Sequence, residues 1–243
     1  MTTVDVVIPV YNEEHSLPPC VATLWSFLNE NINQQWTIVL ADNGATDGTL
    51  DVCKALAEQY PHVRYIHLEQ KGRGRALKKA WLESSADIVS YMDVDLSTGL
   101  EAFPKLLSAI EEGYDIAIGS RLSSASKVER SFKREMISRI YNLLIKVMFF
   151  PPFSDAQCGF KALSRKAVQE LVPLAEDLAW FLDTELLLLA TLKGFRIKEV
   201  PVVWVEDPDS RVRIGKTAWE DIKGLLRMRF QRLPEVSHRT PDA

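Results

Sequence analysis

The feature that most constrains the fold is a repeated alternation of β-branched apolar runs with segments of helical spacing. The apolar runs lie at residues 4–10, 36–42, 63–69, 86–93 and 114–120. The segments between them, at residues 14–30, 48–59, 73–84 and 101–112, carry apolar residues three and four positions apart. Continuous apolar runs are typical of strands that are buried on both faces. The alternation therefore predicts an α/β fold, a mostly parallel central sheet with helices on both faces.

The second half of the chain is less regular, but its composition does not change in a way that marks a linker. It contains an amphipathic stretch over residues 129–150, an apolar helix near 178–192 and a strand over 195–205. We therefore expect one domain over residues 1–232. The polar residues 233–243 are expected to form a flexible tail.

Composition limits the partners and the compartment. Of the 243 residues, 47% are hydrophobic and 26% are charged, and the net charge of −4 gives no overall attraction to nucleic acid. Three widely separated cysteines predict neither a disulfide framework nor a zinc site. No segment approaches the roughly 20 apolar residues of a membrane span. We expect a cytoplasmic protein with no nucleic-acid partner.

Polar or glycine-rich segments follow the first four predicted strands. They read "PVYNEEHSL" from Pro9, "ADNGATDGT" from Ala41, "EQKGRGRAL" from Glu69 and "DVDLS" from Asp93. Any one of them is explained by a turn or a helix cap. Because ligands bind at the carboxyl ends of parallel strands, the four together favour a binding site. The basic residues beside the glycines of the third segment favour a phosphate group there, although a solvated helix start is an equal alternative.

Asp93 and Asp95 stand one residue apart directly after a predicted strand. If the chain bends at Val94, both carboxylates can face one point, where they repel unless a cation lies between them. Mg²⁺ or Mn²⁺ prefers such oxygen ligands and keeps open positions for phosphate oxygens. The alternative for an isolated pair of this kind is two loop caps.

Taken in order, these motifs resemble the family 2 glycosyltransferases with a GT-A fold. The resemblance extends through "GSR" (residues 119–121) and "DAQCGFKAL" (residues 155–163) and covers nearly the whole chain. Within that family it is most similar to the polyprenyl-phosphate sugar synthases, which include the dolichyl-phosphate glucose and mannose synthases. The segment "WFLDTELL" (residues 180–187) and Trp204 lean toward the glucosyl branch.

The resemblance implies a role for individual residues. It places the nucleotide on Pro9, Tyr11, Glu13 and Asp42, the diphosphate along Lys71 and Arg75, and the metal ion on Asp93 and Asp95. Two positions depart from the family pattern. Asn43 replaces the second of two paired aspartates, and Ser97 stands where mannose synthases often have glutamine. An amide at position 43 can still form hydrogen bonds but supplies no charge.

The acceptor decides which further groups are needed. A hydroxyl acceptor needs a general base, for which Asp183 is the candidate, whereas a lipid phosphate is already anionic and needs cations that position it. We expect Arg121 and Arg134 to bind an acceptor phosphate, and Asp155 to position the substrates or lie near the metal ion. Arg211 and Arg213 are expected to close over the donor diphosphate. The catalytic set is then Asp95, Arg121 and Asp155.

The implied activity is inverting transfer of a hexose from a nucleotide-sugar donor, UDP-glucose first and GDP-mannose second, to a polyprenyl-phosphate acceptor. A soluble hydroxyl acceptor and a non-catalytic nucleotide-sugar-binding module are the alternatives. The stretch "MISRIYNLLIKVMFF" (residues 136–150) has the spacing of an interfacial helix, but a core helix fits equally well. "DIKGLLRMRFQR" (residues 221–232) is a second candidate. We expect peripheral contact with the cytoplasmic face of a membrane.

Overall fold

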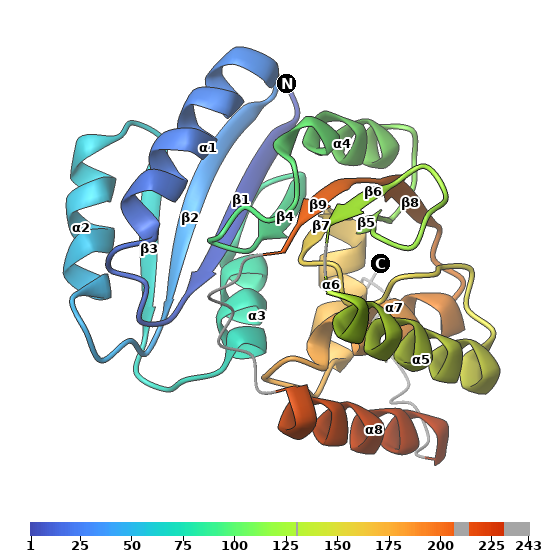
Figure 1. The fold of residues 1–243 in the computed structure, drawn as a ribbon. Coiled ribbons are helices and arrows are strands. Elements are labelled where there is room, and N and C mark those ends of the chain that lie inside the picture. Colours follow the sequence, from blue (N-terminus) through green and yellow to red (C-terminus); the bar gives the residue numbers. More distant parts are fainter. Residues whose placement is uncertain (130, 207–213, 231–243) are drawn as a thin grey trace, which may run out of the picture.

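A computed structural model describes residues 1–129, 131–206 and 214–230 of the chain (Figure 1). Within this part, seven strands form one sheet in the order β3-β2-β1-β4-β7-β5-β8. Their bounds are Thr3–Val10 (β1), Gln35–Asn43 (β2), Val63–Leu68 (β3), Ile88–Met92 (β4), Ile116–Ser120 (β5), Phe160–Ser164 (β7) and Ile197–Pro201 (β8). Strand β7 runs antiparallel to both of its neighbours, and the other pairs are parallel. The predicted α/β fold with a mostly parallel sheet is confirmed.

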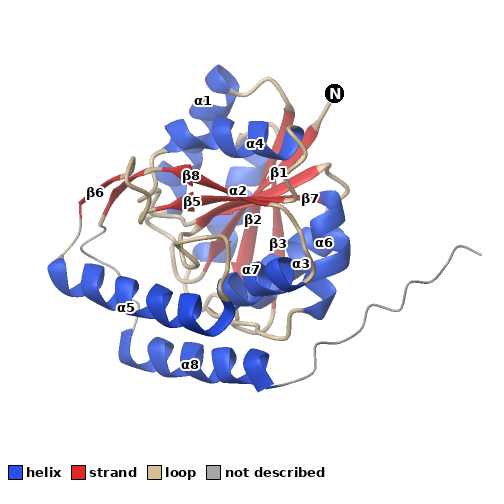
Figure 2. Cartoon of the chain, turned by 90° about the vertical axis from the view of Figure 1, so that its right-hand side faces the viewer, coloured by secondary structure: helices blue, strands red, loops and turns tan. Residues whose placement is uncertain are grey.

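Helices cover both faces of the sheet and build two separate cores. One face carries α1 (Leu17–Asn31), α2 (Thr49–Gln59) and α4 (Phe103–Glu111), and the other carries α3 (Arg73–Glu83), α6 (Arg165–Leu171) and α7 (Leu182–Leu192). Beyond α7, α5 (Phe132–Phe149) and α8 (Ile214–Phe230) lie side by side as an outer layer (Figures 1 and 2). Because β1 directs Val6 and Ile8 to one core and Val7 to the other, the strand is apolar on both faces from Val6 onward.

The second half of the chain differs from the expected elements in two places. Strand β7 was not expected. Its five residues begin at Phe160, directly after Gly159, and do not form a continuous apolar run. The predicted strand over 195–205 is divided at Val202 into β8 and β9 (Val203–Val205), and β9 leaves the main sheet to pair with β6 (Lys127–Glu129). Two 3-10 turns, Leu100–Ala102 and Val172–Leu174, complete the elements. The predicted tail, residues 233–243, lies outside the described residues.

In the described part of the chain, no helix combines the length and the apolar character that crossing a bilayer requires.

The amino end of α3 packs directly on the backbone of residues 178 and 179. The amide of Arg75 donates to the Leu178 carbonyl oxygen at 3.1 Å. A Cβ atom at Gly74 would lie 2.8 Å from the Leu178 carbonyl carbon and 2.9 Å from the Ala179 carbonyl oxygen. Only glycine allows this close approach, which sets the distance between α3 and the segment that leads into α7.

Replacing Gly74 with alanine is expected to lower the free energy of unfolding by about 1 to 3 kcal/mol, because the added methyl group meets backbone that cannot rotate away. Urea unfolding followed by circular dichroism measures the loss. The matched control is Lys79→Ala, which shortens a partly exposed side chain on the same helix and should change stability little. Equal stability of the Gly74→Ala variant and the wild type would show that the contact is loose.

Candidate functional site

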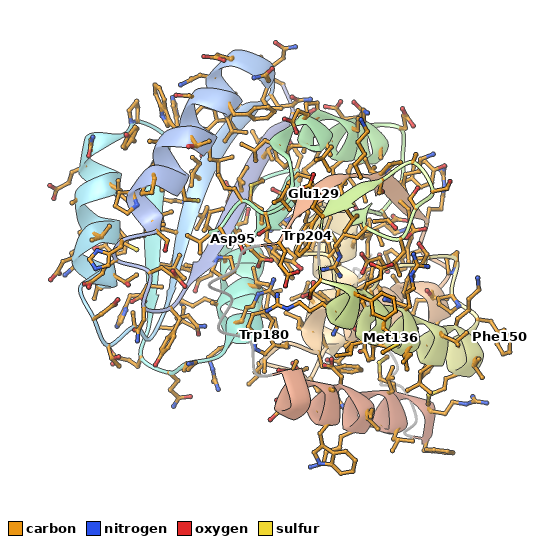
Figure 3. The ribbon with its side chains drawn as sticks, in the orientation of Figure 1. Asp95, Glu129, Met136, Phe150, Trp180 and Trp204 are labelled. Carbon is orange, nitrogen blue, oxygen red and sulfur yellow. The ribbon has the colours of Figure 1, made fainter. Side chains whose placement is uncertain are left out.

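A cavity of ≈ 1220 Å³ opens at the carboxyl ends of β1, β4 and β5 and extends to α5 and α8. Most of the residues predicted from the sequence meet in it. The described lining includes Pro9, Tyr11, Glu13, Lys71, Asp93, Asp95, Arg121, Arg134 and Asp183. Figure 3 shows two labelled members of the lining, Asp95 and Trp204, close together in the middle of the molecule, with Trp180 between them and α8.

The predicted nucleotide residues divide into those that face the cavity and one that lies behind it. Asp42 is fully buried, its Oδ2 atom lies 2.6 Å from Nδ1 of His67, and its Oδ1 atom accepts from the Ala45 amide at 3.1 Å. The neighbouring Asn43 lines the cavity and accepts a hydrogen bond from the Gly72 amide. Asn43, the residue that departs from the family pattern, therefore lies at the cavity, whereas Asp42 does not.

The basic residues of the segment after β3 have different surroundings. The Nζ atom of Lys71 lies 3.4 Å from the centroid of the Tyr11 ring, at the cavity. Arg75 does not line the described part of the cavity. Its Nε atom is buried and has no hydrogen-bond partner among the residues that the structure describes. Arg211 and Arg213 lie outside the described residues, so their predicted role stays a prediction.

Arg73, one of the basic residues that favoured a phosphate group, lines the cavity and pairs with two carboxylates. Its guanidinium donates to Asp93 Oδ1 at 2.9 Å and to Asp183 Oδ2 at 2.8 Å. The other oxygen of Asp183 accepts from Lys161 Nζ at 2.8 Å and from the hydroxyl of Tyr91. Two buried cations and one buried hydroxyl thus hold a single carboxylate.

This network determines the protonation of Asp183. Burial alone would raise the pKa of its carboxyl, but the adjacent Lys161 and Arg73 outweigh burial and hold that pKa below its ordinary value. The pKa of Arg73 is raised well above its usual range because Asp93, Tyr91 and Asp183 outweigh its burial. Asp183 is therefore a permanent anion at neutral pH, and it is a poor general base.

Asp93 and Asp95 can bind a hard divalent cation, but two carboxylates supply too few ligands unless substrate oxygens are added. Both residues line the cavity, and Asp95 Oδ1 accepts from the Ser97 amide at 2.9 Å. A Cβ atom at Gly159 would lie 1.8 Å from Asp93 Oδ2, so glycine leaves the room that this oxygen occupies. The described residues contain no group of three acidic, histidine or cysteine side chains able to hold a metal ion. Phosphate and water oxygens would complete its coordination.

The predicted acceptor residues lie at another part of the cavity. Arg121 donates from Nε to Asp155 Oδ2 at 2.8 Å and from Nη2 to Asp155 Oδ1 at 2.9 Å. Asp155 is fully buried and outside the described lining, and despite burial the Arg121 guanidinium lowers its pKa. Arg134 lines the cavity and pairs with Glu206 at 2.9 Å. Asp155 thus orients Arg121 and leaves further N–H groups of the guanidinium for a ligand.

Three cavity residues were missed by the sequence analysis. Ser138 Oγ and Asp221 Oδ1 are buried and have no hydrogen-bond partner in the described part of the chain, and Gln157 donates to Asp221. Ser138 follows Arg134 by one helical turn, a spacing that could have indicated it. Asp221 shares a helical face with the buried Leu225 and Met228, but the spacing alone does not tell that this face points inward.

Residues 5–172 match the family described as glycosyl transferase family 2. The chain belongs to this family. It is 37% identical over 228 residues to the glycosyltransferase AglD of Haloferax volcanii. The aligned region covers 91% of this chain but 35% of that relative. It is 28% identical over 246 residues to the dolichyl-phosphate beta-glucosyltransferase of Saccharomyces cerevisiae, covering 93% of this chain and 74% of the yeast protein.

A third relative is the dolichol-phosphate mannosyltransferase of Pyrococcus furiosus, 30% identical over 234 residues, with 93% of this chain and 63% of that protein covered. Among solved structures, the fold is similar to that of glucosyl-3-phosphoglycerate synthase from Mycobacterium tuberculosis in complex with UDP. The TM-score is 0.71 at 20% identity, over 97% of this chain and 82% of the other. This similarity confirms the GT-A-like fold that the resemblance implied.

Asp183→Asn is expected to lower the free energy of unfolding at neutral pH by about 3 kcal/mol, because two buried cations lose their counter-charge. The folded pKa of Asp183 is lowered, so its contribution is present above the ordinary value of 3.8 and is lost as the pH falls through the lower folded pKa. The difference between variant and wild type should therefore shrink below pH 3.8. Urea titrations at several pH values measure it.

The control for this prediction is Asp51→Asn, which removes an exposed carboxylate paired with Lys54 on α2. It should leave the unfolding midpoint unchanged, because exposed ion pairs contribute little. A difference between Asp183→Asn and the wild type that does not depend on pH would contradict the assignment of a charged Asp183.

Proposed function

We propose that this chain is an inverting glycosyltransferase that moves a hexose from a nucleotide-sugar to a polyprenyl phosphate at the cytoplasmic face of a membrane. The observation that carries the proposal is that one cavity is lined both by Asp93 and Asp95 and by Arg121 and Arg134. Carboxylates that suit a metal–diphosphate complex and arginines that suit a second anion can thus act on two substrates together.

The donor end of the cavity supports a nucleoside diphosphate sugar. Tyr11 offers an aromatic face, Asn43 an amide, and Lys71 a cation beside them. UDP-glucose is the first choice because several curated relatives are named dolichyl-phosphate beta-glucosyltransferases. GDP-mannose is the second because the Pyrococcus relative is named a mannosyltransferase. Pro9, Glu13 and Asp42 complete the proposed nucleotide site, with Asp42 acting from behind the cavity wall.

Asp93 and Asp95 would hold Mg²⁺ or Mn²⁺, which when bound neutralises charge on the departing diphosphate. The chain itself prepares this position. Arg73 fixes the orientation of Asp93 through one carboxylate oxygen, and the Ser97 amide fixes Asp95. Lys71 supplies a further cation on the diphosphate side of the cavity, together with Arg75 if its side chain turns toward the ligand. Such preorganised charge stabilises a developing anion without further rearrangement.

The acceptor end supports a phosphate rather than a hydroxyl group. Arg121, Arg134 and the hydroxyl of Ser138 all line the cavity, and the hydroxyl has no other partner among the described residues. A phosphate nucleophile is anionic at neutral pH and needs no base, whereas a hydroxyl acceptor does. Asp183, the base expected for a hydroxyl acceptor, is held by Arg73, Lys161 and Tyr91 and stays ionised.

The outer helices beside this end of the cavity support contact with a membrane. On α5, the side chains of Ile140, Leu143 and Val147 are exposed, while Tyr141 and Ile145 on the opposite face are buried. The helix α5 therefore has a buried face that packs on the core and an exposed apolar face that can contact a membrane. On α8, Trp219 and Phe230 are also exposed, and Figure 3 shows Phe150 projecting away from the molecule at the far end of α5. Exposed apolar patches of this kind suit a bilayer surface.

Transfer is tested by incubating the protein with a short polyprenyl phosphate, MgCl₂ and either UDP-glucose or GDP-mannose, and detecting the glycolipid by mass spectrometry. We expect product with one donor. Asp95→Asn should lower kcat by ~100-fold or more, because a charged group at the diphosphate is lost. Arg134→Gln should instead raise the KM for the acceptor by roughly 10- to 100-fold and leave donor binding intact.

The matched control for both variants is Glu112→Gln, which alters an exposed side chain at the end of α4. It should behave as the wild type. Binding of nucleotide-sugar without any turnover in the wild type would reduce the proposal to a non-catalytic binding module. Transfer to a soluble alcohol but not to the lipid phosphate would replace the proposed acceptor.

Membrane contact is tested by flotation with liposomes. The wild type should float with vesicles that contain anionic lipid, and Leu143→Glu combined with Val147→Glu should abolish flotation, because both side chains belong to the exposed face of α5. The matched control is Leu82→Glu, which places the same charge on an exposed leucine of α3. Flotation of the double variant at the wild-type level would exclude α5 as the contact surface. Equal flotation with neutral vesicles would exclude an electrostatic contribution from Arg139 and Lys146.

A further inference from the structure

Asp221 is a buried acid on α8 with one unused oxygen atom. It is 3% exposed, and Gln157 Nε2 donates to its Oδ2 atom at 2.7 Å. Its Oδ1 atom is buried and has no hydrogen-bond partner within the described ranges. Both Asp221 and Gln157 line the cavity that holds Asp93 and Asp95.

An unused carboxylate oxygen in this position destabilises the folded chain, because desolvation is not offset by a hydrogen bond. Three carboxylates act on it: Asp177 from the segment before α7, Asp183 from α7 and Glu220 from α8 itself. Burial, followed by these carboxylates, raises the pKa of Asp221 to about 7, although Gln157 opposes the change. A group kept in such surroundings is expected to meet its partner in a ligand.

The chemistry of the two proposed substrates leaves one partner. The nucleotide belongs to the loops after β1 and β2, where Tyr11 and Asn43 lie. Phosphate oxygens are drawn to the guanidinium groups of Arg121 and Arg134, which line the same cavity. The polyprenyl chain offers no polar hydrogen. The hydroxyl groups of the hexose remain as donors to this oxygen.

We infer that Gln157 and Asp221 bind a hydroxyl group of the transferred hexose and help to select which hexose is accepted. This inference rests on the proposed function and names the side chains that read the sugar. An amide and a carboxyl group side by side can accept from and donate to one hydroxyl, so an epimer with that hydroxyl in another orientation loses both contacts.

The pair is held in place from both sides, as a selective site requires. The backbone N–H of Gln157 donates to Asp155 Oδ1 at 3.2 Å, which ties the backbone at this residue to the Arg121–Asp155 ion pair. On the other side, α8 is fixed close to α7, because a Cβ atom at Gly224 would lie 2.4 Å from the ring of Phe181. Asp183, which acts electrostatically on Asp221, is joined through Arg73 to Asp93. The hexose-binding pair is thus linked to Arg121 on one side and, through Asp183 and Arg73, to Asp93 on the other.

The inference is tested by isothermal titration of the full chain with UDP-glucose and, separately, with UDP, which lacks the hexose. Asp221→Ala should weaken UDP-glucose binding by roughly 10- to 100-fold and leave UDP binding within about twofold. Asp221→Asn and Gln157→Ala should show smaller losses in the same direction. If the wild type prefers GDP-mannose, GDP-mannose and GDP take the place of this pair. Glu112→Gln serves again as the control.

Deoxy analogues of the donor sugar then identify the hydroxyl group. The analogue that lacks this hydroxyl group should bind the wild type as weakly as the complete donor binds Asp221→Ala. For the Asp221→Ala variant, the analogue and the complete donor should bind with equal affinity. Loss of this kind cannot arise from a variant that is merely unstable. Thermal unfolding of each variant is recorded in parallel.

Three results would overturn the inference while the proposed function stands: equal weakening of UDP and UDP-glucose, no weakening of either, or a collapse of kcat in Asp221→Asn with unchanged donor affinity. The last of these would assign Asp221 as a general base for a hydroxyl acceptor. If the wild type binds neither UDP-glucose nor GDP-mannose, the proposed function fails and the inference fails with it.

Discussion

The ion pairs of Arg73 with Asp93 and Asp183 hold the cavity together. Arg73 comes from the start of α3, Asp93 follows β4, and Asp183 lies in the first turn of α7, where Lys161 of β7 reaches it from the other side. Four elements that are distant in sequence are therefore joined at one buried charge cluster. Because each charge in the cluster is paired, the cost of burying it is offset, and the carboxylate at position 93 is oriented before any ligand arrives.

Charge and polarity are divided along the cavity. The carboxylates at positions 93 and 95 lie among loops that follow strands. Arg134 lies on α5, one of the outer helices, and Arg121 lines the same cavity; the exposed faces of these helices carry both apolar and basic side chains. Under the proposed function, this division would suit a water-soluble donor at one end and a lipid-linked acceptor at the other. Each arginine also has a carboxylate partner, Asp155 or Glu206, so the acceptor end is not left with unbalanced positive charge before it is filled.

The sequence was sufficient to predict the parts of the site that depend on strand ends. Asp93, Asp95, Lys71 and Arg121 were expected at one edge of the sheet, and they line one cavity there. The sequence could not tell which of Arg73 and Arg75 faces the cavity. Residues two positions apart on a helix point in nearly opposite directions, so the answer depends on where α3 begins. Asp221 was hidden for a similar reason. Its helix reads as a basic, apolar surface segment, and its inward direction depends on packing against α7.

Strand β7 was the one central element that periodicity did not indicate, and its position affects how the domain is completed. It fits between β4 and β5, both of which precede it in the chain, and it carries Lys161 into the charge cluster. Until residues 160–164 are synthesised, the edges of β4 and β5 that pair with β7 are open. A nascent or truncated chain that stops earlier therefore exposes unpaired strand edges, and the candidate site is assembled only when β7 closes the gap in the sheet.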